Sequence, residues 1–137
     1  MFNALIIDDD PLQLRIAELL LKKSEAFNST SYSNAGLALE YLTKNQQDAS
    51  SLPDVIFIDL NMPKLDGWGF LNKFGELLPG LCKAIRVFIV TSSIDAADYN
   101  RSNEYSYVNG FISKPITPEK LDAIVGHVGT VSPNYRN

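Results

Sequence analysis

The chain of 137 residues contains one cysteine, Cys82, and one histidine, His127. A single cysteine forms neither an internal disulfide nor a thiolate cluster, and a single histidine cannot supply the imidazole pair of many zinc sites. These scarcities exclude a disulfide scaffold and a Cys/His zinc motif. They also favour a reducing compartment, so we expect a cytoplasmic protein in which Cys82 is a small packing residue.

Long apolar runs and basic clusters are also missing. No stretch approaches the roughly 20 apolar residues that cross a bilayer, and the first residues lack the basic and apolar regions of a signal peptide. There are 12 Lys and Arg against 16 Asp and Glu, a formal charge of -4. Nucleic-acid binding needs clustered positive charge. We therefore expect neither a membrane partner nor a nucleic-acid partner.

The composition that remains, with 45% hydrophobic and 20% charged residues, is that of an ordinary globular domain. We predict one domain over residues 1–128 and a C-terminal tail over 129–137, with no room for an output domain. Short apolar runs typical of buried strands occur at 4–8, 28–32, 55–59, 87–91 and 110–113.

Windows with helical spacing separate these runs. In the first, Asp10 is the expected N-cap and Pro11 the first helical residue. The apolar face that we expect to dock on the sheet is formed by Leu12, Ile16, Leu19 and Leu20.

The other helical windows are less uniform. One carries Leu37 and ends before a polar loop at 45–51, one runs over 68–78, and one begins at Thr117. The region 95–107 has little apolar periodicity and predicts a short or mobile helix. Five strands that alternate with five helices predict an α/β fold with a doubly wound parallel sheet, although periodicity does not determine the strand order.

Charged residues follow three of the predicted strands. Asp8 and Asp9 follow the first, Asp59 ends the third, and Lys114 follows the fifth. Ligands of parallel sheets bind beyond the carboxyl ends of the strands, so these side chains should converge on one edge. Carboxylates beside one ammonium favour a site for a divalent cation and a phosphoryl group.

The residue types suggest separate roles in such a site. Asp59 is the candidate nucleophile, because a carboxylate can attack phosphorus and form an acyl phosphate. Asp8 and Asp9 could hold Mg²⁺, to which Asn61 could add its backbone carbonyl. Lys114 could neutralise phosphoryl oxygens.

With these motifs in view, residues 3–128 resemble the receiver domain of two-component response regulators, of the free-standing type. The matching motifs are Asp8-Asp9, Asp59-Leu60-Asn61-Met62-Pro63 with Asp66-Gly67, Thr91-Ser92-Ser93 and Lys114-Pro115. The resemblance implies a flavodoxin-like five-stranded sheet in the order 2-1-3-4-5. It also implies that Asp59 accepts a phosphoryl group with Mg²⁺ bound by Asp59, Asp9, the Asn61 carbonyl and, through water, Asp8.

The same resemblance assigns Thr91 and Lys114 to the phosphoryl oxygens, and Thr91 and Phe111 to a conformational switch. Phe111 stands where the family more often has Tyr, so its ring lacks a hydroxyl. The implied partners are a sensor histidine kinase or histidine phosphotransfer protein and a downstream target protein. The chain would be a monomer or a phosphorylation-dependent dimer, with self-phosphorylation and autodephosphorylation as its only catalysis.

Two other functions compete with this one. Asp8 and Asp10 have the spacing of a phosphatase of the haloacid dehalogenase type, but Asn61 cannot donate a proton two residues after Asp59. The second alternative is a receiver-like interaction module that is never phosphorylated. Such a module would lack an acceptor Asp, a Thr or a Lys, and none of these is missing here.

Overall fold

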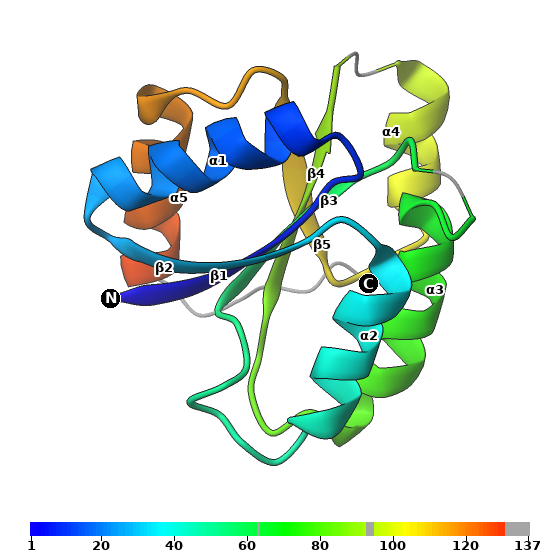
Figure 1. The fold of residues 1–137 in the computed structure, drawn as a ribbon. Helices are drawn as coiled ribbons and strands as arrows, with labels where there is room; N and C mark the ends of the chain where they lie inside the picture. Colours follow the sequence, from blue (N-terminus) through cyan, green and yellow to red (C-terminus); the bar gives the residue numbers. More distant parts are fainter. Residues whose placement is uncertain (63, 93–94, 131–137) are drawn as a thin grey trace.

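The computed structural model describes residues 1–62, 64–92 and 95–130, with side chains described up to residue 126. Its strands form one parallel sheet in the order β2-β1-β3-β4-β5, which confirms the flavodoxin-like prediction (Figure 1). Their bounds are β1 Phe2–Ile7, β2 Phe27–Tyr32, β3 Val55–Asp59, β4 Arg86–Thr91 and β5 Val108–Ser113.

Five helices connect and follow these strands. Their bounds are α1 Pro11–Ser24, α2 Ala35–Lys44, α3 Gly67–Leu77, α4 Ala96–Ser102 and α5 Pro118–Thr130, with a 3₁₀ turn, η1, at Leu78–Gly80. The uncertain region 95–107 therefore contains a helix of 7 residues. Within the described residues, no helix combines the length and the apolar character that crossing a bilayer requires.

The sheet is covered on both sides. Helices α1 and α5 lie over one face, and α2, α3 and α4 lie on the other (Figure 1). Two apolar cores result, one on each face of the sheet. Every residue of β3 and β4 is buried, which is the pattern of central parallel strands covered on both faces.

The first helix begins as predicted but turns a different face to the sheet. The Asp10 carboxylate accepts a hydrogen bond from the Leu12 backbone N–H at 3.0 Å, so Asp10 is the N-cap. Ala17 and Leu21 are the fully buried residues of α1. Predicted face residues remain exposed instead, at 66% for Leu12, 37% for Ile16 and 49% for Leu19.

Leu20 is partly buried and packs against the core as predicted, whereas the prediction for the other three residues was wrong for a physical reason. Apolar residues cover more than half of the circumference of α1, and Leu14 and Leu21 lie opposite Leu12, so the apolar spacing does not select one narrow stripe. Contacts with α5 and the sheet decide the rotation. Leu37 of α2 is likewise 50% exposed. Cys82 is exposed rather than packed. Residues 131–137 of the predicted tail lie outside the described residues.

Candidate functional site

The carboxyl ends of three strands bring acidic and basic side chains together. The Lys114 ammonium lies 3.0 Å from Asp8 Oδ2 and 3.6 Å from Asp59 Oδ2. Asp8 directly follows β1, Asp59 ends β3 and Lys114 directly follows β5. The convergence predicted from strand ends is therefore present, although 106 residues separate Asp8 from Lys114.

A third carboxylate completes the cluster. One oxygen each from Asp8, Asp9 and Asp59 can be chosen so that all lie within 4.8 Å of one another. Asp8 and Asp59 are each 6% exposed. Carboxylates at this separation and burial repel one another, and Lys114 supplies one positive charge against three negative ones.

This crowding changes the protonation equilibria of the cluster. Burial raises the pKa of Asp59 above its ordinary value, and the Asp8 carboxylate adds to the rise while Lys114 opposes it. Burial works against the Lys114 ammonium, but Asp8 and Asp59 outweigh it, so the pKa of Lys114 is raised. The site therefore keeps its ammonium charged and favours any further cation that stabilises ionised Asp59.

Local backbone contacts orient the two buried carboxylates. The Asp10 N–H donates to Asp8 Oδ1 at 2.9 Å, and the Asn61 N–H lies 3.4 Å from Asp59 Oδ1. The Asn61 side chain itself is exposed. Each aspartate thus keeps its second oxygen, Oδ2, toward Lys114.

Gly67 is a site residue whose role the sequence did not reveal. A Cβ atom at this position would lie 2.6 Å from the Asp59 carbonyl oxygen and 2.8 Å from Leu60 Cα. The Gly67 N–H also donates to the Leu60 carbonyl at 3.1 Å. The Asp66-Gly67 pair predicted a turn, but only the folded chain shows that α3 begins against the backbone of the candidate nucleophile.

Thr91 ends β4 and Phe111 lies on β5, and the switch roles of both residues stay predictions. Thr91 is 2% exposed at the end of β4, and its carbonyl accepts a hydrogen bond from the Lys114 N–H at 2.8 Å. The half-buried Phe111 ring on β5 stacks on Tyr99 of α4, with centroids 6.0 Å apart. Tyr99 was not predicted to contact the switch.

Trp68, which follows Gly67, belongs to the core and not to the charged cluster. Its ring stacks on Tyr105 with centroids 5.7 Å apart, and the Arg101 guanidinium lies 4.5 Å from the ring centre. Trp68 therefore makes a packing contact at the start of α3.

A pocket opens from the cluster along α1. Its lining includes Asp8, Asp59 and Lys114 together with Gln13, Ile16 and Ile116. The charged groups of the cluster therefore share a small pocket with the apolar residues Ile16 and Ala17 of α1.

The acidic residues fit a divalent cation. Mg²⁺ prefers oxygen ligands and takes one or two carboxylates together with water and phosphate oxygens. Asp8, Asp9 and Asp59 provide carboxylates at suitable separations, and the repulsion among them would be relieved by a cation. The chemistry of this donor set therefore agrees with magnesium rather than with a soft thiolate-binding metal.

Comparisons with known proteins give one consistent result. Residues 4–126 match the family model described as the response regulator receiver domain. The two-component response regulator ARR22 of Arabidopsis thaliana is 26% identical over 129 residues, which cover 93% of this chain and 84% of that protein. The 3',5'-cyclic-nucleotide phosphodiesterase regA of Dictyostelium discoideum is 32% identical over 119 residues, which cover 85% of this chain but 14% of that protein.

Solved structures agree on the fold. The crystal structure of a two-component response regulator from Cytophaga hutchinsonii superposes with a TM-score of 0.84 at 24% identity, covering 94% of this chain and 97% of that chain.

Proposed function

Because the chain belongs to the response regulator receiver family, we propose that it is a phospho-accepting signalling protein in which Asp59 takes a phosphoryl group in the presence of Mg²⁺. The observation that carries this proposal is the cluster of Asp8, Asp9 and Asp59 at the carboxyl edge of the sheet, with the Lys114 ammonium beside Asp8 and Asp59. We propose that the protein catalyses only its own phosphorylation and dephosphorylation. We also propose that it is cytoplasmic.

The proposed transfer forms one bond and breaks one. When the donor is a phosphohistidine, a carboxylate oxygen of Asp59 bonds to phosphorus and the bond from phosphorus to the histidine nitrogen breaks. That nitrogen keeps the electron pair and takes a proton from water. Lys114 is already within 3.6 Å of Asp59, so its ammonium can follow the charge onto the phosphoryl oxygens. The buried Thr91 hydroxyl would donate to another of these oxygens.

Asp8, Asp9, Asp59 and the Asn61 carbonyl would hold the magnesium ion. When bound, Mg²⁺ supplies positive charge that offsets repulsion between the carboxylates and the incoming phosphoryl group. The protein's own contribution is to orient Asp59 through the Asn61 N–H and to keep Lys114 beside it.

The phosphatase alternative finds no support in the geometry. Its second aspartate would be Asp10, but the carboxylate of Asp10 caps α1 through the Leu12 N–H, and the residue is exposed. An acid that is engaged as a helix cap is not poised to protonate a leaving group in the cluster.

The central experiment is phosphoryl labelling with acetyl phosphate and Mg²⁺, followed by intact mass. The wild type should gain one phosphoryl group and Asp59→Asn none. Asp54→Asn is the matched control, because Asp54 pairs with Lys83 at the other end of the sheet and should leave labelling intact. Equal labelling of the wild type and Asp59→Asn would reject Asp59 as acceptor, and an unlabelled wild type would favour the unphosphorylated interaction module.

The proposed donor is a histidine kinase or a histidine phosphotransfer protein, and α1 offers it a surface. Leu12, Ile16 and Leu19 are exposed along this helix, and Ile16 lines the same pocket as Asp59 and Lys114. A protein donor that brings phosphohistidine to Asp59 would cover these side chains and bury apolar area.

A charged substitution on this surface of α1 can distinguish an effect on docking of the protein donor from an effect on phosphoryl transfer itself. Ile16→Glu should slow transfer from a protein donor about tenfold or more, because a charge at the centre of an apolar contact costs binding energy, while labelling by acetyl phosphate stays normal. Leu37→Glu is the control, since Leu37 is 50% exposed on α2 at the opposite face of the sheet. An equal effect of the two variants would contradict docking on α1.

A further inference from the structure

Lys120 of α5 holds the backbone on both sides of Lys114. Its ammonium donates hydrogen bonds to the Ser113 carbonyl at 2.6 Å, the Ser113 hydroxyl at 3.0 Å and the Pro115 carbonyl at 3.0 Å. These acceptors belong to the residues immediately before and after Lys114. One ammonium therefore ties together the end of β5 and the connection to α5.

The position of Lys114 depends on this segment. Its N–H donates to the Thr91 carbonyl at 2.8 Å, and its ammonium reaches Asp8 at 3.0 Å but Asp59 only at 3.6 Å. The longer of the two contacts is the one to the candidate nucleophile. A small shift of the Lys114 backbone would therefore weaken the contact with Asp59 first, because charge-assisted contacts lose strength quickly beyond hydrogen-bond distance.

Helix α5 provides a rigid base for Lys120. The Lys120 N–H lies 3.3 Å from the Thr117 hydroxyl, and the Leu121 N–H donates to the Thr117 carbonyl at 3.1 Å. Leu121 is 1% exposed in the core beneath α1 and α5. The ammonium is thus anchored through the packed side of the helix, and not through a free loop.

We propose that Lys120 is a positioning residue that sets the reach of Lys114 toward Asp59. The proposal rests on the function proposed above, because it assigns Lys120 to the phosphoryl-transfer site. Lys120 touches neither Asp8 nor Asp59 in the contacts of the described residues, and it acts through the backbone that carries Lys114. Fixing a catalytic ammonium by contacts behind it is a common requirement for efficient transfer.

The first test is Lys120→Met, which keeps most of the unbranched side chain and removes the ammonium donors. The initial rate of Mg²⁺-dependent phosphoryl uptake from acetyl phosphate should fall about tenfold, since small misplacements of reacting groups have effects of this order. The Mg²⁺ dissociation constant, measured by titration, should stay within about twofold, because the proposed ligands come from β1, β3 and their loops. An unchanged rate of uptake would overturn the proposal.

Lys83→Met controls for a general loss of stability. The Lys83 ammonium also makes three contacts, at the other end of the sheet, to the Asp54 carboxylate at 2.9 Å and to the Ala49 and Leu52 carbonyls at 3.0 Å. Both variants should lower Tm, but only Lys120→Met should slow phosphoryl uptake. Equal slowing by both variants at a temperature where both are folded would overturn the proposal.

A double-mutant cycle tests whether Lys120 acts through Lys114. In a Lys114→Ala background, Lys120→Met should add no further loss of rate, because the group that it positions is gone. Lys120→Arg, which retains donors, should restore part of the rate. Independent, multiplicative losses in the cycle would contradict a positioning role.

A spectroscopic measurement separates failure of this inference from failure of the proposed function. The NMR signal of the Lys114 side-chain ammonium should move in Lys120→Met and stay in place in Lys83→Met, whether or not the protein accepts phosphate. An unlabelled wild type would reject the proposed function alone. An unmoved Lys114 signal in Lys120→Met would reject the positioning role.

Discussion

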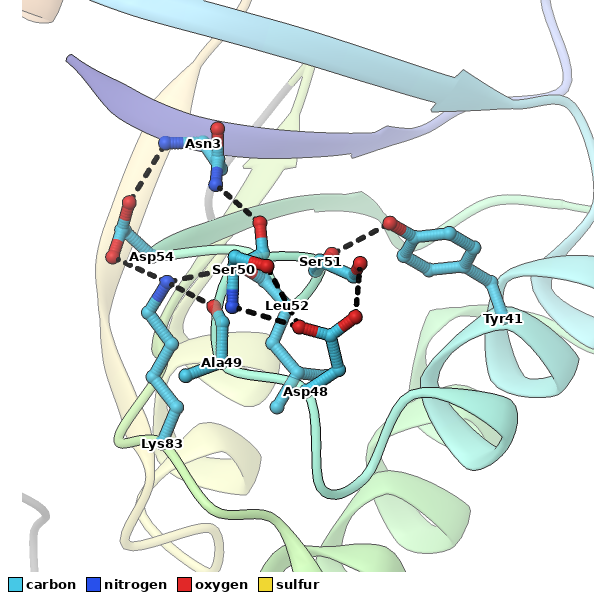
Figure 2. Close-up of polar contacts among 9 residues, drawn as sticks. All are labelled: Asn3, Tyr41, Asp48, Ala49, Ser50, Ser51, Leu52, Asp54 and Lys83. Carbon is cyan, nitrogen blue, oxygen red and sulfur yellow. Dashed lines mark hydrogen bonds and ion pairs between the residues drawn. The ribbon is translucent and has the colours of Figure 1, made fainter.

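The two ends of the central sheet each place a lysine against an aspartate, with different consequences. At the amino ends of the strands, Lys83 pairs with Asp54 at 2.9 Å, and the second oxygen of Asp54 accepts the Asn3 N–H at 2.7 Å (Figure 2). At the carboxyl ends, Lys114 faces two buried carboxylates, with Asp9 close by.

The amino-end network is chemically complete. Lys83 also donates to two backbone carbonyls, and Asp48 accepts hydrogen bonds from Ser50 and Ser51 that lower its pKa. Figure 2 shows these contacts closing the 48–52 loop onto β1 and α2, where the Tyr41 hydroxyl donates to the Ser51 carbonyl at 2.6 Å. Lys83 and Asp54 balance each other in charge, and each oxygen of Asp48 accepts a hydrogen bond from a serine hydroxyl, so the network holds a loop in place.

In the carboxyl-end cluster, the negative and positive charges are not balanced. The cluster has more negative charge than its single ammonium balances. The pKa of Asp59 is raised by burial, and the neighbouring Asp8 carboxylate adds to the rise. At the amino edge, the Lys83–Asp54 ion pair is satisfied internally and serves structure. An excess of buried carboxylates instead indicates a place for an external cation or a reacting group.

The largest expected effect concerns glycines at the two ends. Gly67→Ala should lower stability by roughly 2 to 3 kcal/mol, because its new Cβ meets backbone atoms that cannot move away easily, and phosphoryl uptake should fall with it. Gly80→Ala, where a Cβ meets the end of the flexible Gln46 side chain at 2.6 Å, should cost much less. Urea unfolding of both variants measures the difference, and similar losses would mean that the Asp59 backbone yields as readily as a side chain.

The next prediction is that replacing an aspartate with asparagine changes the stability in opposite directions at the two ends of the sheet. Without metal at neutral pH, Asp54→Asn should destabilise by about 1 to 2 kcal/mol, because it breaks a charge-assisted contact on each oxygen. Asp59→Asn should instead stabilise by up to about 1 kcal/mol, because it relieves repulsion. Thermal unfolding in the presence of a chelator tests this, and a loss of stability in both variants would show that the cluster is already balanced.

Magnesium should stabilise the protein only through the cluster at the carboxyl end of the sheet. At about ten times its dissociation constant, Mg²⁺ should stabilise the wild type by about 1.4 kcal/mol. Asp9→Asn should raise Tm in the absence of metal and abolish the magnesium-dependent rise, whereas Asp54→Asn should keep that rise. Full magnesium stabilisation of Asp9→Asn would show that Asp9 is not a ligand.

The smallest effect is a pH dependence in the metal-free protein. Because the pKa of Asp59 is raised in the folded state, the native protein binds this proton more tightly than the unfolded chain does. The contribution of Asp59 to the free energy of unfolding therefore falls as the pH rises from the ordinary aspartate pKa of 3.8 through the raised pKa of the folded state. The free energy of unfolding of Asp59→Asn should exceed that of the wild type by an amount that grows across this pH window and vanishes below it. Denaturant unfolding at several pH values measures this difference.

Much of this protein was determined locally and was therefore predictable from its sequence. The aliphatic runs of the central strands, the Asp10 cap and the charges that follow β1, β3 and β5 depend on neighbours in the chain. Since parallel strands share one carboxyl edge, local patterns were enough to bring Asp8, Asp59 and Lys114 together.

Tertiary structure decided what depends on distant surfaces. An α1 helix with apolar residues on most sides buries Ala17 and Leu21, and leaves Leu12 exposed, only because of the sheet and helix against which it packs. The closeness of Gly67 to Asp59 and the reach of Lys120 around Lys114 are likewise set by how separate elements meet. Periodicity describes one element at a time, whereas these contacts arise from the docking of two.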